Sequence, residues 1–92
     1  EISYELLGAA GNGYFFCIAP VSENTYQLLL LHREGRIVHR DQIVLDDAET
    51  LYRTFFVTPE GNLAGLFGGK LSVGVHLWET RRYIEEDNDQ NR

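Results

Sequence analysis

The sequence predicts an all-β fold built of antiparallel sheets. Apolar and polar residues alternate with the period of two that is typical of strands, most regularly over residues 71–77, where Leu71, Val73, Val75 and Leu77 alternate with smaller or polar residues. Clusters of Gly, Pro, Asn and acidic residues recur at short intervals and predict tight turns. The segments between these turns are too short for typical helices, so we expect consecutive strands joined by hairpin connections.

The first half of the chain is expected to form four strands, at residues 2–6, 14–18, 25–32 and 36–45. Gly and Asn residues at 8–13 tolerate positive φ and predict the first turn. Residues 20–24 and the pair Glu34–Gly35 predict the next two turns. This half, with its linker, gives a first unit at residues 1–49.

The second half is expected to contain strands at 51–58, 63–67, 71–77 and 82–84, giving a second unit at residues 50–84. In the linker that ends the first unit, residues 46–49, three of which are acidic, interrupt the strand pattern or cap a single helical turn through Asp46 or Asp47. Residues 85–92 have no apolar side chain, and we expect them to form an acidic, disordered tail.

The charge balance narrows the class of partner. The formal net charge is −6 and the pI is near 4.9, which argues against nucleic acid because phosphate binding needs Lys and Arg.

No apolar stretch approaches the ~20 residues of a membrane span. Cys17 is the only cysteine, so no intrachain disulfide forms, and its apolar surroundings predict a buried thiol. A chain that starts at Glu1 and has no Met is expected to be a fragment or a processed chain.

The two halves resemble each other. Residues 5–18 align with residues 54–67 at an offset of 49, and residues 30–38 align with residues 76–84 at an offset of 46. Each half then reads as strand, Gly-containing turn, strand, longer turn, strand, tight turn, strand. A period near 45–50 residues with four strands per repeat is typical of β-propeller blades.

Residues 55–84 also resemble a WD40-type propeller blade. Pro59–Glu60–Gly61 matches the turn between the first two strands of such blades, and Trp78–Glu79 matches the end of their third strand. The resemblance covers about thirty residues. It implies two consecutive propeller-like blades of four antiparallel strands that serve as a binding platform without catalysis.

No residue pattern indicates a catalytic, cofactor or metal site. The three histidines, His32, His39 and His76, lack the spacing of metal ligands, and we interpret them as structural. His39–Arg40–Asp41 matches a kinase catalytic-loop tripeptide, but the other kinase motifs are missing. Residues 68–70 read as a hairpin turn because the phosphate-loop spacing fails around them. The acidic residues at 46–49 and 85–89 fit no calcium-binding loop and are interpreted as solvated charges.

The sequence therefore predicts a non-catalytic protein-interaction or scaffolding module, a fragment of a larger β-propeller protein. The alternative is a self-contained eight-strand antiparallel barrel or sandwich that binds a small apolar ligand, and a third reading is an enzyme subunit whose active site lies elsewhere. Two isolated blades would leave apolar faces bare, so we expect a protein partner or self-association, for example three chains in a six-bladed ring. The candidate interaction residues are Trp78, Phe15, Phe16 and Phe67, together with Ile18 and Leu66. Trp78 reads either as core or as an exposed binding anchor.

Overall fold

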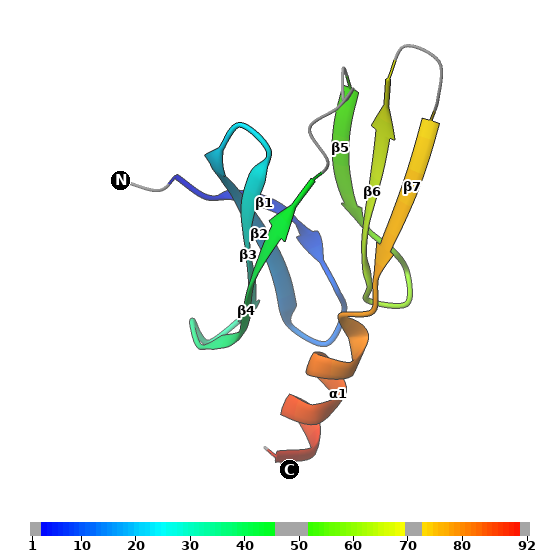
Figure 1. Ribbon diagram of the computed structural model, residues 1–92. Coiled ribbons are helices and arrows are strands. Elements are labelled where there is room, and N and C mark those ends of the chain that lie inside the picture. The colour runs from blue at the N-terminus through cyan, green and yellow to red at the C-terminus, as the bar shows by residue number, and fades with distance from the viewer. Residues whose placement is uncertain (1–2, 46–51, 70–72, 91–92) are drawn as a thin grey trace.

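The computed structural model describes residues 3–45, 52–69 and 73–90, which form two antiparallel sheets and one C-terminal helix (Figure 1). The predicted all-β class is confirmed. Sheet A contains β1 (Glu5–Ala9), β2 (Tyr14–Ser22), β3 (Thr25–His32) and β4 (Ile37–Val44). Sheet B contains β5 (Tyr52–Val57), β6 (Leu63–Gly68) and β7 (Val73–Trp78), and α1 (Arg81–Gln90) follows. The two sheets do not close into a barrel, so of the predicted alternative, a barrel or a sandwich, the barrel is wrong.

Each sheet is a meander in which consecutive strands are hydrogen-bonded neighbours. The first strands of the two sheets, β1 and β5, lie side by side. A Cβ atom built on Gly8 of β1 would lie 3.6 Å from the Cγ2 atom of Val57 in β5. The two sheets are therefore closest along the strands with which each begins.

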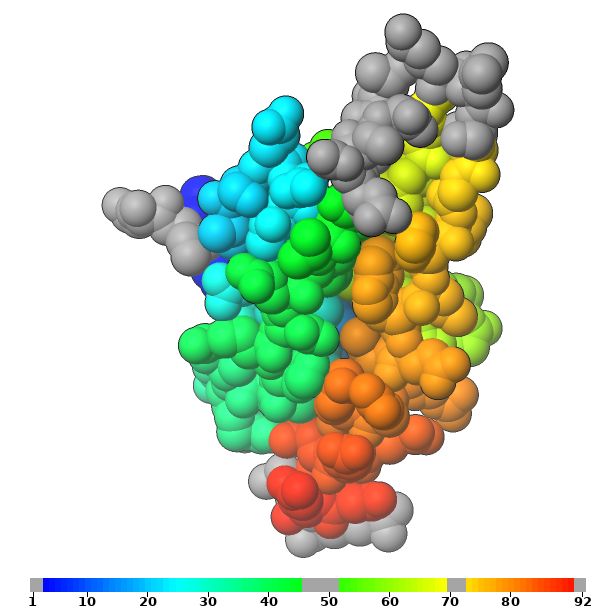
Figure 2. Space-filling view, in the orientation of Figure 1, coloured from blue at the N-terminus to red at the C-terminus, as the bar shows by residue number. Residues whose placement is uncertain are grey.

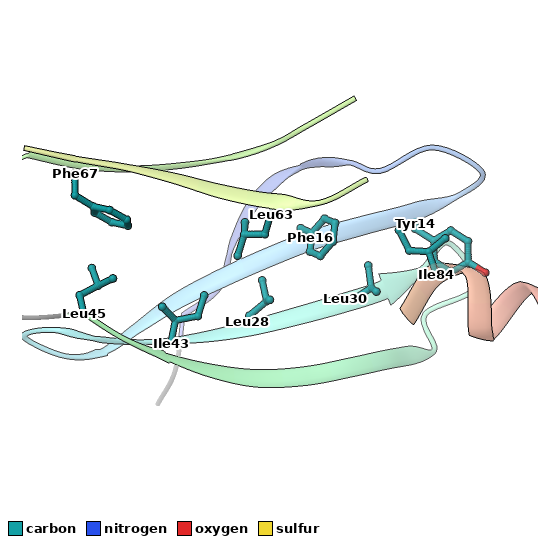
Figure 3. Close-up of a cluster of buried hydrophobic side chains, with 9 residues drawn as sticks. All are labelled: Tyr14, Phe16, Leu28, Leu30, Ile43, Leu45, Leu63, Phe67 and Ile84. Carbon is teal, nitrogen blue, oxygen red and sulfur yellow. The ribbon is translucent and has the colours of Figure 1, made fainter. Parts of the chain in front are cut away.

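The hydrophobic core lies between the two sheets (Figure 3). Side chains point inwards from both sheets, and Ile84 of α1 closes one end of the cluster. The buried core residues are Tyr14, Phe16, Leu28, Leu30, Ile43, Leu45, Leu63, Phe67 and Ile84. Full burial of an aliphatic or aromatic side chain contributes about 1.5–3 kcal/mol, so this layer is the main source of stability.

The C-terminal segment differs from the sequence prediction. We expected a strand at 82–84 and a disordered tail from 85, but residues 81–90 form α1. The helix buries Ile84 and Asp87, three residues apart on one face, and its first turn is held by the Asn62 side chain, whose Oδ1 accepts the Arg81 N–H at 2.9 Å. Figure 2 shows α1 packed against the N-terminal part of β4, where His39 contacts Tyr83.

Two strands of sheet A extend beyond their predicted bounds. β1 continues through Ala9, with a register irregularity between Leu6 and Gly8. β2 continues past Pro20 to Ser22, where a proline was expected to end it. Pro20 is tolerated because β1 ends its pairing at Ile18, so the proline faces only β3. The predicted helical turn at 46–49 and the ends of strands predicted at 51 and 71–72 lie outside the described residues.

The internal repeat has a structural counterpart in the first three strands of each sheet. The offset of 49 places Tyr14 on Leu63, and these residues begin β2 and β6 and are both buried. The offset of 46 places His32 on Trp78, which end β3 and β7. In each sheet the two equivalent residues face each other across the ladder, Tyr14 opposite His32 and Leu63 opposite Trp78. The equivalence stops at the fourth element, which is a strand in sheet A and α1 after sheet B.

Candidate interaction surface

The surface of sheet B that points away from the core is almost entirely apolar. Register pairs fix its membership, because residues directly opposite each other in an antiparallel ladder point to the same side. We call this surface the outer face of sheet B. Its residues are Tyr52, Thr54, Phe56, Ala64, Leu66, Gly68, Val73, Val75 and Leu77.

Most of the large side chains on this face are exposed. The β7 residues Val73, Val75 and Leu77 are 74%, 69% and 58% exposed. Tyr52 and Phe56 of β5 are 55% and 44% exposed. None of the nine residues is charged. A contiguous apolar surface of this kind is unusual on a soluble monomer.

The inner face of sheet B holds Trp78. Its ring lies 6.1 Å from the ring of Phe55 and 6.5 Å from the ring of Phe67, measured between centroids. Trp78 is half-buried and packs against the core cluster. Of its two predicted roles, the geometry favours a core residue over a surface anchor.

The other predicted interaction residues divide between the two sides of the sheets. Phe16 is fully buried and Phe67 is 9% exposed, so both lie in the core and neither forms a bare face. Ile18, also expected on a bare face, is buried too. Phe15 is half-buried and points to the other side of β2, because neighbouring residues of a strand alternate between faces. Sequence reasoning missed Val73, Val75 and Leu77 as surface residues, although their alternation was its clearest strand signal.

The side of sheet A that faces away from the core is also rich in apolar residues, but it is mixed. Its apolar members include Leu6, Phe15, Leu29, Leu31 and Ile37. Exposed Arg40 and Gln42 lie on the same side, on β4. Cys17 lies there as well, and burial raises the pKa of its thiol, which keeps it protonated at neutral pH.

The edge strands of the two sheets also differ in charge and in the regularity of their pairing. β7, the edge of sheet B, has no charged residue, no proline and no register irregularity against β6. β4, the edge of sheet A, carries Arg40 and Asp41 and has an irregular register at Leu30–Leu31 of β3. Charges and bulges are the devices by which natural sheets prevent edge-to-edge pairing. β4 has them and β7 does not.

A buried polar cluster fixes α1 to sheet A. The Tyr14 hydroxyl donates to the Asp87 carboxylate at 2.7 Å, and the Arg36 guanidinium pairs with the same carboxylate. The Arg36 hydrogen bond holds the pKa of Asp87 below its ordinary value, and burial followed by the Asp87 hydrogen bond raises the pKa of Tyr14. The side chain of Asn88 lies 3.0 Å from the same hydroxyl. Nothing local in the sequence signals this cluster, because Tyr14 and Asp87 are 73 positions apart.

The three histidines pack against aromatic rings. His32 lies edge-on to Tyr14 at 5.2 Å, and His39 stacks on Tyr83 of α1 at 3.6 Å. His76 lies edge-on to Phe67 at 5.4 Å. Within residues 3–45, 52–69 and 73–90, no three His, Cys, Asp or Glu side chains converge as a metal site would require.

The His39–Arg40–Asp41 tripeptide lies on edge strand β4, where successive side chains alternate between faces. A separate feature is an open cleft of about 340 Å³ that lies between the two sheets. Charged Glu5 and Arg53 line the cleft beside Leu7 and Phe55. The Arg53 guanidinium is already engaged, because it donates to the backbone carbonyl of Glu23 and lies 3.2 Å from the Tyr26 hydroxyl.

Comparison of the chain with protein-family models, with curated proteins and with solved structures found no match. Among the described residues, no helix has both the length and the apolar composition needed to cross a membrane.

Proposed function

We propose that this chain is a non-catalytic protein-interaction or scaffolding module, made of two consecutive propeller-like blades of a larger β-propeller protein. Its binding surface is the outer face of sheet B. The partner is a protein surface with a complementary apolar patch, supplied by the parent assembly or by another copy of the chain.

The exposed apolar character of that face carries the proposal. Five large apolar side chains, between 44% and 74% exposed, lie on one side of a three-stranded sheet. The centre of a protein interface is depleted in charged residues and enriched in aromatic ones. The outer face of sheet B has no charge and presents Tyr52 and Phe56, so it has the composition of an interface centre.

The arrangement of the sheets supports the propeller part of the proposal. Both sheets are meanders, their first strands β1 and β5 lie together, and the repeat equivalences hold through three strands. Blades of a propeller are arranged radially around a central channel, so each blade has a neighbour on either side. A pair of blades taken from such a ring would keep one contact and expose two apolar faces, which is the pattern of sheets A and B.

A small apolar ligand fits the surface poorly. Sites for small molecules are concave and mostly apolar. The cleft between the sheets is open and contains the charged side chains of Glu5 and Arg53, whereas the exposed apolar residues lie on the side of a sheet. The geometry therefore favours a protein partner over a small ligand.

Sedimentation equilibrium of the purified chain tests the proposal. We expect association that increases with concentration, and we expect Phe56→Asp to weaken it at least tenfold, because a carboxylate would have to be desolvated in the interface. Tyr4→Asp is the matched control, since Tyr4 is an aromatic residue of similar exposure, 38% against 44%, and lies outside both sheets. A folded chain that stays monomeric at millimolar concentration would overturn the proposal.

A further inference from the structure

We propose that the free edge of β7 pairs antiparallel with β7 of a second copy of this chain, joining the two B sheets into one six-stranded sheet. The inference deepens the proposed function and rests on it, because β7 borders the outer face of sheet B. Edge pairing would leave that face exposed and double its width, so pairing along the edge and docking on the face are separable events.

The free edge of β7 has the regular, uncharged character that allows another strand to pair with it. Every second side chain from Val73 to Leu77 is aliphatic, and its pairing with β6 is regular over all six residues. An exposed, regular and uncharged edge strand presents a row of unpaired N–H and C=O groups to any other strand. The Thr80 hydroxyl and the Asn62 amide hold the chain at the end of β7, so α1 turns away and does not continue the sheet.

The other strand edges of the described chain are occupied or protected. β4 carries Arg40 and Asp41, and α1 lies against it through the stacked rings of His39 and Tyr83. β1 and β5 are not paired in one sheet, but they lie against each other. Among the described strands, β7 is therefore the edge that has neither a charged residue nor a strand or helix other than β6 packed along it.

A second copy is the occupant that the sequence of β7 favours. Antiparallel pairing of β7 with itself around Val75 places Val73 opposite Leu77 and Gly74 opposite His76 of the second copy. Aliphatic side chains then face one another on the outer side, and no two like charges meet, which is the requirement for a stable cross-strand pair. A two-fold contact of this kind uses the same surface on both chains and closes as a dimer.

Disulfide trapping tests the geometry. In a Cys17→Ser background, Val75→Cys places two thiols across the two-fold axis, where the Cα atoms of facing residues are about 4.5–5.5 Å apart and within the range of a disulfide. We expect this variant to form covalent dimers under mild oxidation. Val44→Cys is the matched control, because Val44 is an edge valine of β4 with nearly the same exposure, 67% against 69%. Equal trapping of both variants would overturn the inference.

Hydrogen exchange of the unmodified chain separates edge pairing from docking on the face. Edge pairing should protect the β7 amides that are not bonded to β6, with protection increasing at least tenfold as the protein concentration is raised. Docking on the outer face would leave those amides exchanging freely. Association without protection of the β7 amides would overturn edge pairing and leave the proposed function standing, whereas a monomer at every concentration would overturn both.

Discussion

Gly65 is the residue on which the packing of the inner face of sheet B depends. A Cβ atom at this position would lie 2.5 Å from Cζ of Phe67 and 3.2 Å from Cζ3 of Trp78. Both rings belong to the core side of the sheet and would have to move. We expect Gly65→Ala to destabilise the fold by roughly 1–3 kcal/mol, the usual cost of overpacking, as measured by urea unfolding.

Gly74→Ala is the control for that prediction. Gly74 lies on the same inner face, on the neighbouring strand β7, but a Cβ atom there would meet nothing within 4 Å. We expect its effect to stay within about 0.5 kcal/mol, as for other substitutions that touch nothing. Equal losses in the two variants would show that strand propensity, rather than the Phe67 and Trp78 rings, sets the cost.

Trp78 gives a second test at the scale of one residue. It is half-buried and joins Phe55, Phe67 and His76 in a cluster of rings. We expect Trp78→Ala to cost roughly 3 kcal/mol, at the low end for truncation of a large aromatic residue because part of its surface is already in water. Trp78→Phe should recover most of this stability. A loss below about 1 kcal/mol in thermal or urea unfolding would contradict a core role.

The individual elements show which parts of the fold could be predicted. β3 has the predicted bounds, 25–32, because a short apolar run between two turns leaves no other solution. β6 and β7 were predicted to within a residue or two over the part that the structure describes. Strand alternation also assigned Trp78 correctly to the side opposite Val75. It gave no means of deciding which side of each strand faces the other sheet, so Phe16 and Phe67 were wrongly placed on a bare surface.

α1 could not be predicted because its stabilising contacts are distant in sequence. Its residues are mostly acidic and polar, and a helix of this length is marginal in water by itself. It forms here because Ile84 enters the core and Asp87 meets Tyr14 and Arg36. The spacing of Tyr83, Ile84 and Asp87 on one helical face was the only local signal, and the acidic composition obscured it.

The polar cluster under α1 makes its docking depend on pH. The pKa of Asp87 is lowered in the folded chain, so its contribution to stability is present above its unfolded value, near 3.9, and is lost as pH falls through the folded pKa. The pKa of Tyr14 is raised, so its contribution is present below about 10 and is lost as pH rises through the folded value. Docking of α1 should therefore be strongest between these limits.

Asp87→Asn tests the loss of stability that we expect at low pH. We expect wild type to be more stable than Asp87→Asn at neutral pH. The difference should shrink as pH falls from about 4 through the lowered folded-state pKa of Asp87, below which both side chains are uncharged. Urea unfolding across this range measures the difference. Asp41→Asn on β4 is the control, because its carboxylate is more than half exposed and its closest ionic partner is His39 at 3.7 Å. A difference that stays constant through the acid range would contradict the Arg36–Asp87 account.

At the scale of the whole molecule, stability and association are expected to be linked. A chain of 92 residues buries only about 60–65% of the surface of its unfolded form, and this chain has no intrachain disulfide to add to that margin. It also leaves apolar surface exposed on the outer face of sheet B. Only folded chains can form a dimer that buries this surface. Dimer formation therefore stabilises the folded state by mass action.

The melting temperature should therefore rise with protein concentration. A tenfold rise in concentration adds about 1.4 kcal/mol to a dimer, and the usual unfolding entropy per residue converts this to roughly 4 °C for two chains of this length. Val75→Lys should abolish the dependence, because a lysine on an edge strand opposes pairing. Val44→Lys should leave it intact if β7 pairs with β7, and should reduce it if sheet B instead docks on the far side of sheet A, where Val44 lies. Calorimetry of the three chains over two decades of concentration thus identifies which surface meets which, and a melting temperature that does not depend on concentration would contradict association altogether.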